Sequence, residues 1–163
     1  IIGILGGRFM SYTIIDIVDK TINIEEKRIA VINEMINENK SLPTINILGK
    51  VFQKESIKMI DYYKNIKSQL VNSEVEEIDF RTYDNISFLI NEFCNKIFVP
   101  KAKTPKEYLR YNLTTISDEL ALFIDIQGRL VNNAHKTSGV TYNILSGIIL
   151  RMKERIENIN KIL

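Results

Sequence analysis

Apolar residues recur along most of this chain at alternating spacings of three and four positions. In residues 13–39 they form one stripe, with Glu25 in a slot between Ile22 and Ile29. In residues 141–163 the stripe runs without a gap as far as Leu163. Such a stripe is what an α-helix needs to bury one side against neighbouring helices. The pattern predicts an architecture and is silent about chemistry.

Helix breakers divide the first half of this pattern. The first predicted helix covers about residues 13–39 and ends before Pro43, because proline disfavours helical geometry in the residue that precedes it. The second covers about residues 44–71. The third begins either at Ser73, where Glu76 would complete a capping box, or later, near Thr82.

The clearest helix start in the sequence is the segment that begins with Thr104. Threonine is a good N-cap, Pro105 suits the first helical position, and Glu107 completes a capping box. We expect this fourth helix to stop at Gly139 and the fifth to cover about residues 141–163. Neither strand alternation nor a two-residue hairpin turn is evident in the sequence. The predicted fold is therefore all-α, an antiparallel bundle of about five long amphipathic helices.

Length and composition agree with one globular domain. The chain has 163 residues, 45% of them hydrophobic and 26% charged, and a net charge of +2. We assign residues 10–163 to a single helical-bundle domain. Residues 1–9 precede Met10 and differ in composition, so we interpret them as a cloning-derived or upstream-read segment, or as the remnant of a leader. The heavy use of Ile, Asn and Lys is typical of an AT-rich bacterial genome.

Cysteine content and hydropathy suggest where the protein works. A single cysteine means that no internal disulfide forms, so packing must hold the fold, and a reducing cytoplasm is the natural compartment. No apolar run approaches the roughly 18–20 residues that a membrane-spanning helix requires. We expect a soluble cytoplasmic protein with no membrane partner.

The single histidine excludes several kinds of metal chemistry. A ferritin-like di-iron site needs two Glu-x-x-His elements, and the sequence has none. A structural zinc site wants about four Cys or His ligands and would have only Cys94 and His135. The glycine-rich start of the chain lacks the Lys-Ser/Thr pair of a phosphate-binding loop. Acidic residues are plentiful enough for a carboxylate-only magnesium site, but no paired acidic motif recurs at matching helical spacing. We therefore predict no metal and no cofactor.

One pair of residues is a candidate for catalysis. Arg129 and His135 form an Arg-x5-His string that resembles the signature of HEPN domains, small all-helical proteins that often act as RNases through such a pair. The resemblance implies a general acid or base at His135 and a phosphate contact at Arg129. Most HEPN motifs place a polar residue directly after the arginine, and here it is Leu130. The alternative is structural: Arg129 pairs with Asp125 four residues earlier, and His135 helps to end the helix.

A basic cluster at the start of the fourth helix is a candidate nucleic-acid contact. Its cations could hold phosphates while a tyrosine stacks on a base. The alternative is a solvated loop whose tyrosines pack inward. The residues of this cluster are Lys101, Lys103, Lys106, Tyr108, Arg110 and Tyr111.

Two polar residues occupy apolar slots, Glu25 in the first helix and Gln127 in the fourth. Buried polar groups are costly unless they are paired, so each would line a pocket or fix the register of its helix. The alternative is that the stripe drifts to the surface at these positions.

The functional hypothesis that follows is a non-enzymatic helical-bundle interaction or regulatory module. We expect it to act by binding a protein partner or by self-association, with a dimer contact on the fifth helix. Two other hypotheses are a nucleic-acid-binding protein, with or without HEPN-like RNase activity, and a bundle that binds a small ligand.

Overall fold

The computed structural model describes residues 11–134 and 139–163, and five α-helices make up most of them. Within these two ranges no strand occurs, and the only pairing of extended backbone is an isolated bridge between Tyr12 and Ile78. The prediction of an all-α bundle is confirmed. None of the described helices is both long enough and apolar enough to cross a membrane. The helices are α1 (Ile14–Glu38), α2 (Pro43–Leu70), α3 (Phe80–Asn95), α4 (Pro105–Ala134) and α5 (Val140–Ile162).

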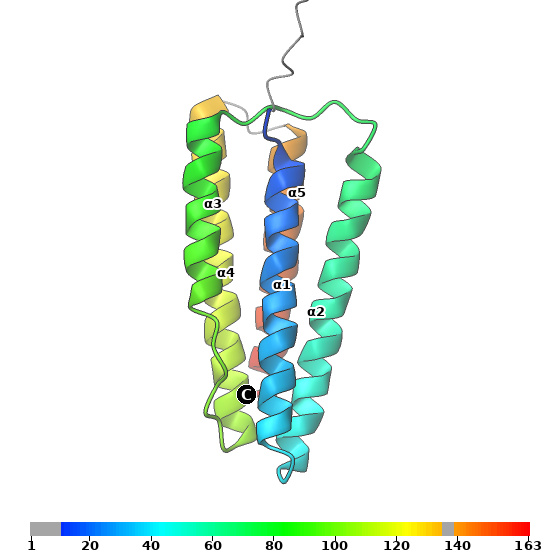
Figure 1. Ribbon diagram of the computed structural model, residues 1–163, viewed down its shortest axis with the longest axis vertical. Helices are drawn as coiled ribbons and strands as arrows, with labels where there is room; N and C mark the ends of the chain where they lie inside the picture. Colours follow the sequence, from blue (N-terminus) through cyan, green and yellow to red (C-terminus); the bar gives the residue numbers. More distant parts are fainter. Residues whose placement is uncertain (1–10, 135–138) are drawn as a thin grey trace, which may run out of the picture.

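The five helices lie side by side in two layers. Figure 1 shows α3, α1 and α2 in the front layer, with α4 behind α3 and α5 behind α1. The chain reverses direction at every connection, so α1, α3 and α5 point one way and α2 and α4 the other. The α2–α3 connection crosses the start of α1, where the Ile78 amide donates to the Tyr12 carbonyl at 2.7 Å.

The first helix begins at a capping box that the sequence did not single out. The hydroxyl of Thr13 accepts from the Ile15 amide at 3.2 Å, and the Asp16 carboxylate accepts from the Thr13 amide at 2.8 Å. These bonds satisfy amides that have no partner inside a helix. The observed helix, Ile14–Glu38, lies within one residue of the predicted range at each end.

Close contact between α1 and α2 depends on a glycine. A Cβ atom built on Gly49 of α2 would lie 2.9 Å from side-chain atoms of Met35 and Ile36 of α1. Glycine in a helix costs about 1 kcal/mol relative to alanine. Here that cost permits the two helices to pack closely.

The third helix starts at the later of the two predicted positions. Asp79 is its N-cap, and its carboxylate accepts from the Thr82 amide at 3.0 Å. The alternative start at Ser73 is wrong, because the chain before Asp79 is extended and buries Ile78 against the bundle. Only three side chains of α3 are fully buried, so this helix is the most peripheral of the five.

The start of α4 follows the capping box read from the sequence. The Glu107 amide donates to the Thr104 hydroxyl at 3.2 Å, and the Thr104 amide donates to the Glu107 carboxylate at 3.3 Å. The prediction for Gly139 is corrected. It is the N-cap of α5 and has an ordinary φ of −84°, and it lies beyond the end of α4 at Ala134.

Buried apolar side chains form two clusters along the bundle. The larger one occupies the end near the start of α1, and the smaller one occupies the opposite end. The apolar stripe of α5 is used in these clusters: Leu145, Ile149, Met152 and Ile159 are all buried. The stripe that we predicted as a dimer contact therefore packs inside the chain, and Leu163 at its end is 40% exposed.

Candidate functional site

Four charged side chains lie buried near the middle of the bundle, between the two apolar clusters. They are Glu25 and Arg28 of α1, Glu119 of α4 and Arg155 of α5, and we call them the ionic layer. Each is at most 7% exposed. Charged residues are almost never buried to this extent unless they are paired. The layer is therefore the most unusual feature of the described structure.

Glu25 is the centre of the ionic layer. Arg155 Nη1 donates to Glu25 Oε1 at 2.7 Å, and Arg28 Nε lies 3.7 Å from Glu25 Oε2. Arg28 Nη2 donates to Glu119 Oε2. Helix α2 borders the layer with Glu55, whose Oε2 lies 4.0 Å from Arg155 Nε. Side chains from four helices thus meet in one set of ionic contacts.

The two carboxylates of the layer differ in acidity because their surroundings differ. Burial alone would raise the pKa of Glu25, but the guanidiniums of Arg155 and Arg28 outweigh it, and the pKa is lowered. Burial raises the pKa of Glu119, and repulsion by Glu25 adds to this effect, while Arg28 offsets it only in part. Burial also holds the pKa of the Tyr63 hydroxyl well above its ordinary value, and both carboxylates reinforce that shift.

The chemistry open to the ionic layer is limited by what occupies it. In di-metal carboxylate bundles, glutamates and Glu-x-x-His pairs project into the interior and hold the metals. Here Arg28 follows Glu25 at that spacing, so a guanidinium lies where such a bundle has a metal ligand. Among the residues that the structure describes, no group of three or more His, Cys, Asp or Glu could hold a metal ion. The layer is suited to joining helices.

Sequence reasoning found Glu25 and missed its partners. The alternative in which the stripe drifts to the surface at Glu25 is wrong, because this carboxylate is fully buried. The apolar pattern did not single out Arg155, which is also buried. The available signal was spacing: Arg155 follows the core residue Met152 by three positions and precedes Ile159 by four.

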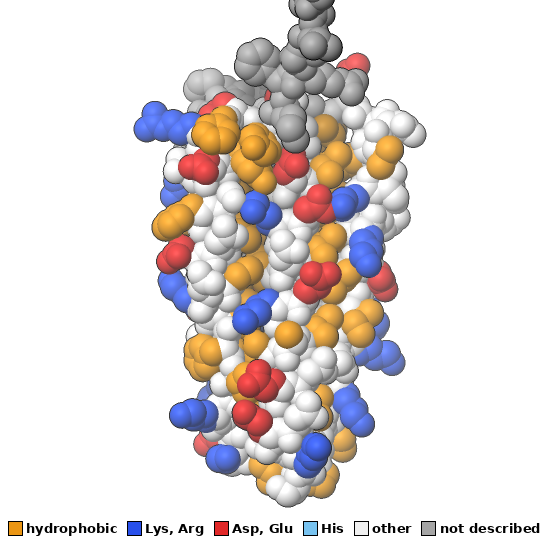
Figure 2. Space-filling view, in the orientation of Figure 1, with side chains coloured by type: hydrophobic (Ala, Val, Ile, Leu, Met, Phe, Trp, Pro, Cys, Tyr) orange, Lys and Arg blue, Asp and Glu red, His pale blue; other side chains and the backbone are white. Residues whose placement is uncertain are grey.

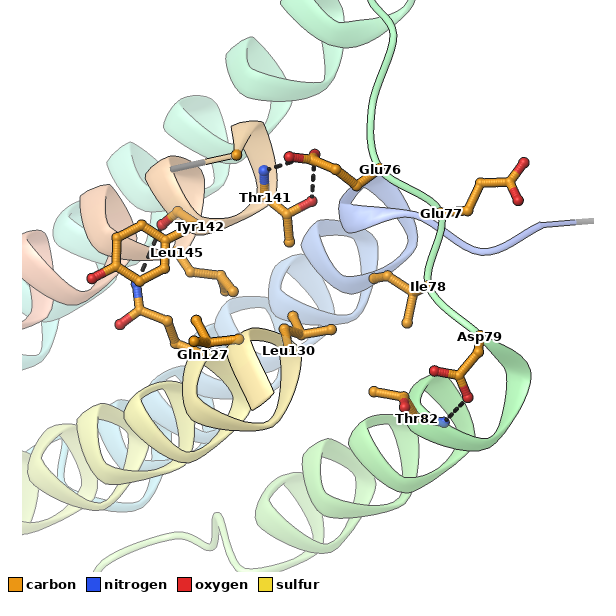
Figure 3. Close-up of a pocket in the computed structure, with 12 residues that line it drawn as sticks. Glu76, Glu77, Ile78, Asp79, Thr82, Gln127, Leu130, Thr141, Tyr142 and Leu145 are labelled. Atoms are coloured by element: carbon orange, nitrogen blue, oxygen red, sulfur yellow. Dashed lines mark hydrogen bonds between the residues drawn. The ribbon is translucent and has the colours of Figure 1, made fainter. Parts of the chain in front are cut away.

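A second candidate site lies at the end of the bundle where the α2–α3 connection crosses it. A cavity of about 380 Å³ lies there between this connection, α4 and α5. Figure 3 shows Ile78, Leu130 and Leu145 among its apolar residues, while the Glu77 side chain points away from the others. Several polar side chains at the cavity already cap a helix or join two helices.

Glu76 caps α5 from a distant part of the chain. Its Oε2 accepts from the Thr141 amide at 3.2 Å and from the Thr141 hydroxyl at 3.1 Å (Figure 3). A Cβ atom on Gly139 would lie only 1.7 Å from Glu76 Oε1. A side chain at position 139 would therefore displace the Glu76 carboxylate from this arrangement, although the backbone conformation of Gly139 is one that any residue adopts.

Gln127 lines this cavity and is separate from Glu25. Its side-chain amide donates to the Tyr142 carbonyl at 3.2 Å and to the Ser146 hydroxyl at 2.8 Å, so it joins α4 to α5. Glu25 is not among the residues that line the cavity. The structure therefore does not bring the two polar candidates of the sequence together in one pocket.

The Arg-x5-His candidate is described only at its arginine. Arg129 Nε donates to Asp125 Oδ2 at 2.8 Å, one turn away on α4, and both side chains are nearly half exposed. This is the surface pair that the structural alternative predicted. His135 lies outside the described residues.

The basic cluster keeps its cations on the surface, while one of its tyrosines is buried and the other half-buried. The lysines and Arg110 are exposed, whereas Tyr108 is 1% exposed and packs edge-on against Phe52. Burial raises the pKa of Tyr108 to about 12. Tyr111 is half-buried and donates its hydroxyl to the Phe98 carbonyl at 2.6 Å. Tyr108 is therefore unable to stack on a base.

Comparison of this chain with models of known protein families, with curated proteins and with solved structures finds no significant match.

Proposed function

We propose that this chain is a non-enzymatic helical-bundle module that acts by associating with protein, first of all with a second copy of itself. The observation that carries the proposal is how the charged and apolar side chains are distributed. The four charged side chains of the ionic layer are paired with one another and are closed to solvent. Large apolar side chains, in contrast, remain exposed on several helices.

Large apolar side chains are exposed on four of the five described helices, α2, α3, α4 and α5. Figure 2 shows hydrophobic side chains scattered over the face formed by α3, α1 and α2, between charged residues of both signs. Single exposed apolar residues are common, but neighbouring ones form patches of the kind that bind other proteins. Ile47 and Val51 lie one turn apart on α2 and are both exposed. Those with at least 45% exposure within the described helices are Ile47, Val51, Ile57, Phe80, Phe88, Ile124, Leu150 and Ile162.

Native mass spectrometry of gently purified protein tests this proposal. We expect a complex of twice the chain mass of 18.9 kDa with no small molecule or nucleic acid attached. A monomer that carries RNA or a small ligand would overturn the proposal and favour one of the two other hypotheses. A bare monomer at every concentration would also contradict it.

A further inference from the structure

We infer that the outer face of α2 binds an acidic amphipathic helix of a partner protein. This surface goes beyond the self-association proposed above and does not depend on it. Helix α2 lies at the edge of the bundle, where one of its sides packs along α1 (Figure 1). The side that faces away from the bundle is exposed, and we call it the α2 surface. Its residues are Ile47, Lys50, Val51, Lys54, Ile57 and Lys58.

The lysines of the α2 surface form a continuous ridge. Lys50, Lys54 and Lys58 follow one another at intervals of four residues, and side chains at this spacing make one ridge of a helix surface. Figure 2 shows basic and hydrophobic side chains along the edge of the molecule that α2 forms. Like charges at this spacing repel one another and weaken the helix. The lysine ridge therefore opposes the stability of α2.

Ion pairs within the chain do not neutralise the lysine ridge. Among the described residues, the lysines that form ion pairs are Lys67 and Lys161, and neither belongs to the ridge. Helix α2 exposes four lysines against one carboxylate, that of Asp61. The α2 surface thus carries positive charge that carboxylates of a partner would complement.

Rows of aliphatic side chains lie on both sides of the lysine ridge. Ile47 and Val51 each precede a lysine of the ridge by three positions, which places them in the row on one side. Ile57 follows Lys54 by three positions and lies on the other side. Ile47 is 63% exposed, and the other two are close to half exposed. A helix packed along this surface would meet both charged and aliphatic side chains.

A protein helix fits the α2 surface better than the other occupants do. A phosphate backbone would pair with the lysines and leave the aliphatic rows without apolar contacts. A helix that lies in a membrane keeps its charges away from its apolar face, whereas Lys54 lies between the two aliphatic rows. A second copy that used the same surface would set lysine against lysine. An acidic helix with an apolar stripe supplies carboxylates for the ridge and apolar side chains for the rows.

Fluorescence anisotropy with a designed peptide tests the charged part of the surface. The peptide is an amphipathic helix with leucines along one stripe and glutamates on both sides of it. We expect the wild-type chain to bind it and not to bind a control peptide with lysines in place of the glutamates. Lys54→Glu combined with Lys58→Glu should raise the Kd by about 30-fold, because attractive contacts become repulsive. Lys103→Glu combined with Lys106→Glu makes the same change in net charge at the exposed start of α4 and should bind like wild type.

A substitution without a change in charge tests the aliphatic rows. Ile47→Ser removes an apolar contact, and we expect the Kd for the glutamate peptide to rise by about tenfold. Leu150→Ser is the matched control, because Leu150 is 57% exposed on α5. All of the substituted side chains are exposed, so every variant should keep the circular dichroism spectrum of the wild-type chain.

The expected result is weaker binding in both α2 variants with both controls unchanged. No binding of the glutamate peptide, unchanged binding in Ile47→Ser, or equal losses in the controls would overturn the inference. Single-stranded RNA and phosphatidylserine vesicles are tested alongside, and tighter binding of either one through the same lysines would also overturn it. A monomeric chain that binds the peptide would overturn the proposed self-association and leave the α2 surface standing.

Discussion

The Arg155 guanidinium and the Glu25 carboxylate are 2.7 Å apart in the interior, although 130 residues separate them in the sequence. Glu25 is fully buried and Arg155 is 7% exposed. A buried ion pair adds little net stability compared with well-packed apolar residues, but the loss of one partner leaves a charge without compensation. We expect the pair to favour the arrangement that brings Arg155 of α5 next to Glu25 of α1.

Removal of Glu25 should destabilise the fold strongly. Glu25→Ala leaves two guanidiniums buried without their shared carboxylate, and we expect a loss of about 3–5 kcal/mol in the free energy of unfolding. Glu26→Ala, at the exposed neighbouring position, should change it by less than about 0.5 kcal/mol. Urea denaturation of both variants measures the difference. Equal effects would show that Glu25 is not held as described.

The contact between Arg28 and Glu119 should show strong coupling. Glu119→Leu alone leaves Arg28 without the carboxylate that it bonds, and we expect a loss of about 3–5 kcal/mol. Arg28→Met combined with Glu119→Leu replaces the pair by apolar side chains and should recover most of that loss. A double-mutant cycle from urea denaturation measures the coupling free energy, which we expect to be at least as large as the recovered loss. Additive single effects would contradict the contact.

The free energy of unfolding should fall as the pH rises through the folded-state pKa of Glu119. Burial raises the pKa of Glu119 in the folded state above the ordinary value of 4.5. The folded state then binds more protons than the unfolded state above that pH, so stability falls as pH rises through the folded pKa. The pKa of Glu25 is lowered, so its contribution is lost only as pH falls below 4.5. The two effects occupy different pH ranges.

Urea denaturation at a series of pH values from 4.5 upward measures this fall. Glu119→Gln does not titrate, so its stability should fall less steeply over the same range. Glu55 also has a pKa raised by burial and contributes a change of the same sign, which is why the comparison with Glu119→Gln is needed. Identical slopes in the two proteins would rule out Glu119 as the titrating group.

The start of α5 should depend on Glu76. Glu76→Ala removes the carboxylate that accepts from the Thr141 amide and hydroxyl, and an N-terminal cap contributes about 0.5–2 kcal/mol. Glu77→Ala is the matched control, because Glu77 is adjacent and exposed. Thermal unfolding, together with hydrogen exchange at the first turn of α5, measures the loss. A larger effect of Glu77→Ala would contradict the assigned cap.

The helices could be predicted from sequence because each buries a regular apolar stripe. The α1 stripe and the Thr104–Glu107 capping box gave the ends of α1 and the start of α4 to within one residue. The start of α3 stayed open in the sequence because it depends on a contact between Ile78 and Tyr12, which are far apart in the chain. Local patterns do not contain such contacts.

The ionic layer was only partly predictable for a related reason. Glu25 stood out because it interrupts an otherwise apolar stripe. Glu119 and Arg155 lie beside apolar stripe positions, where helical spacing fits a buried or a boundary residue equally well. Which of these a charged residue becomes depends on a partner from another helix, and a single sequence does not state that pairing.

Sedimentation equilibrium of the wild-type chain over a wide concentration range tests the central claim, that this bundle works by self-association. We predict that the apparent mass rises with concentration from 18.9 kDa to twice that value and then stays constant, as expected of a closed two-fold dimer. A single species of 18.9 kDa at every concentration would contradict the claim.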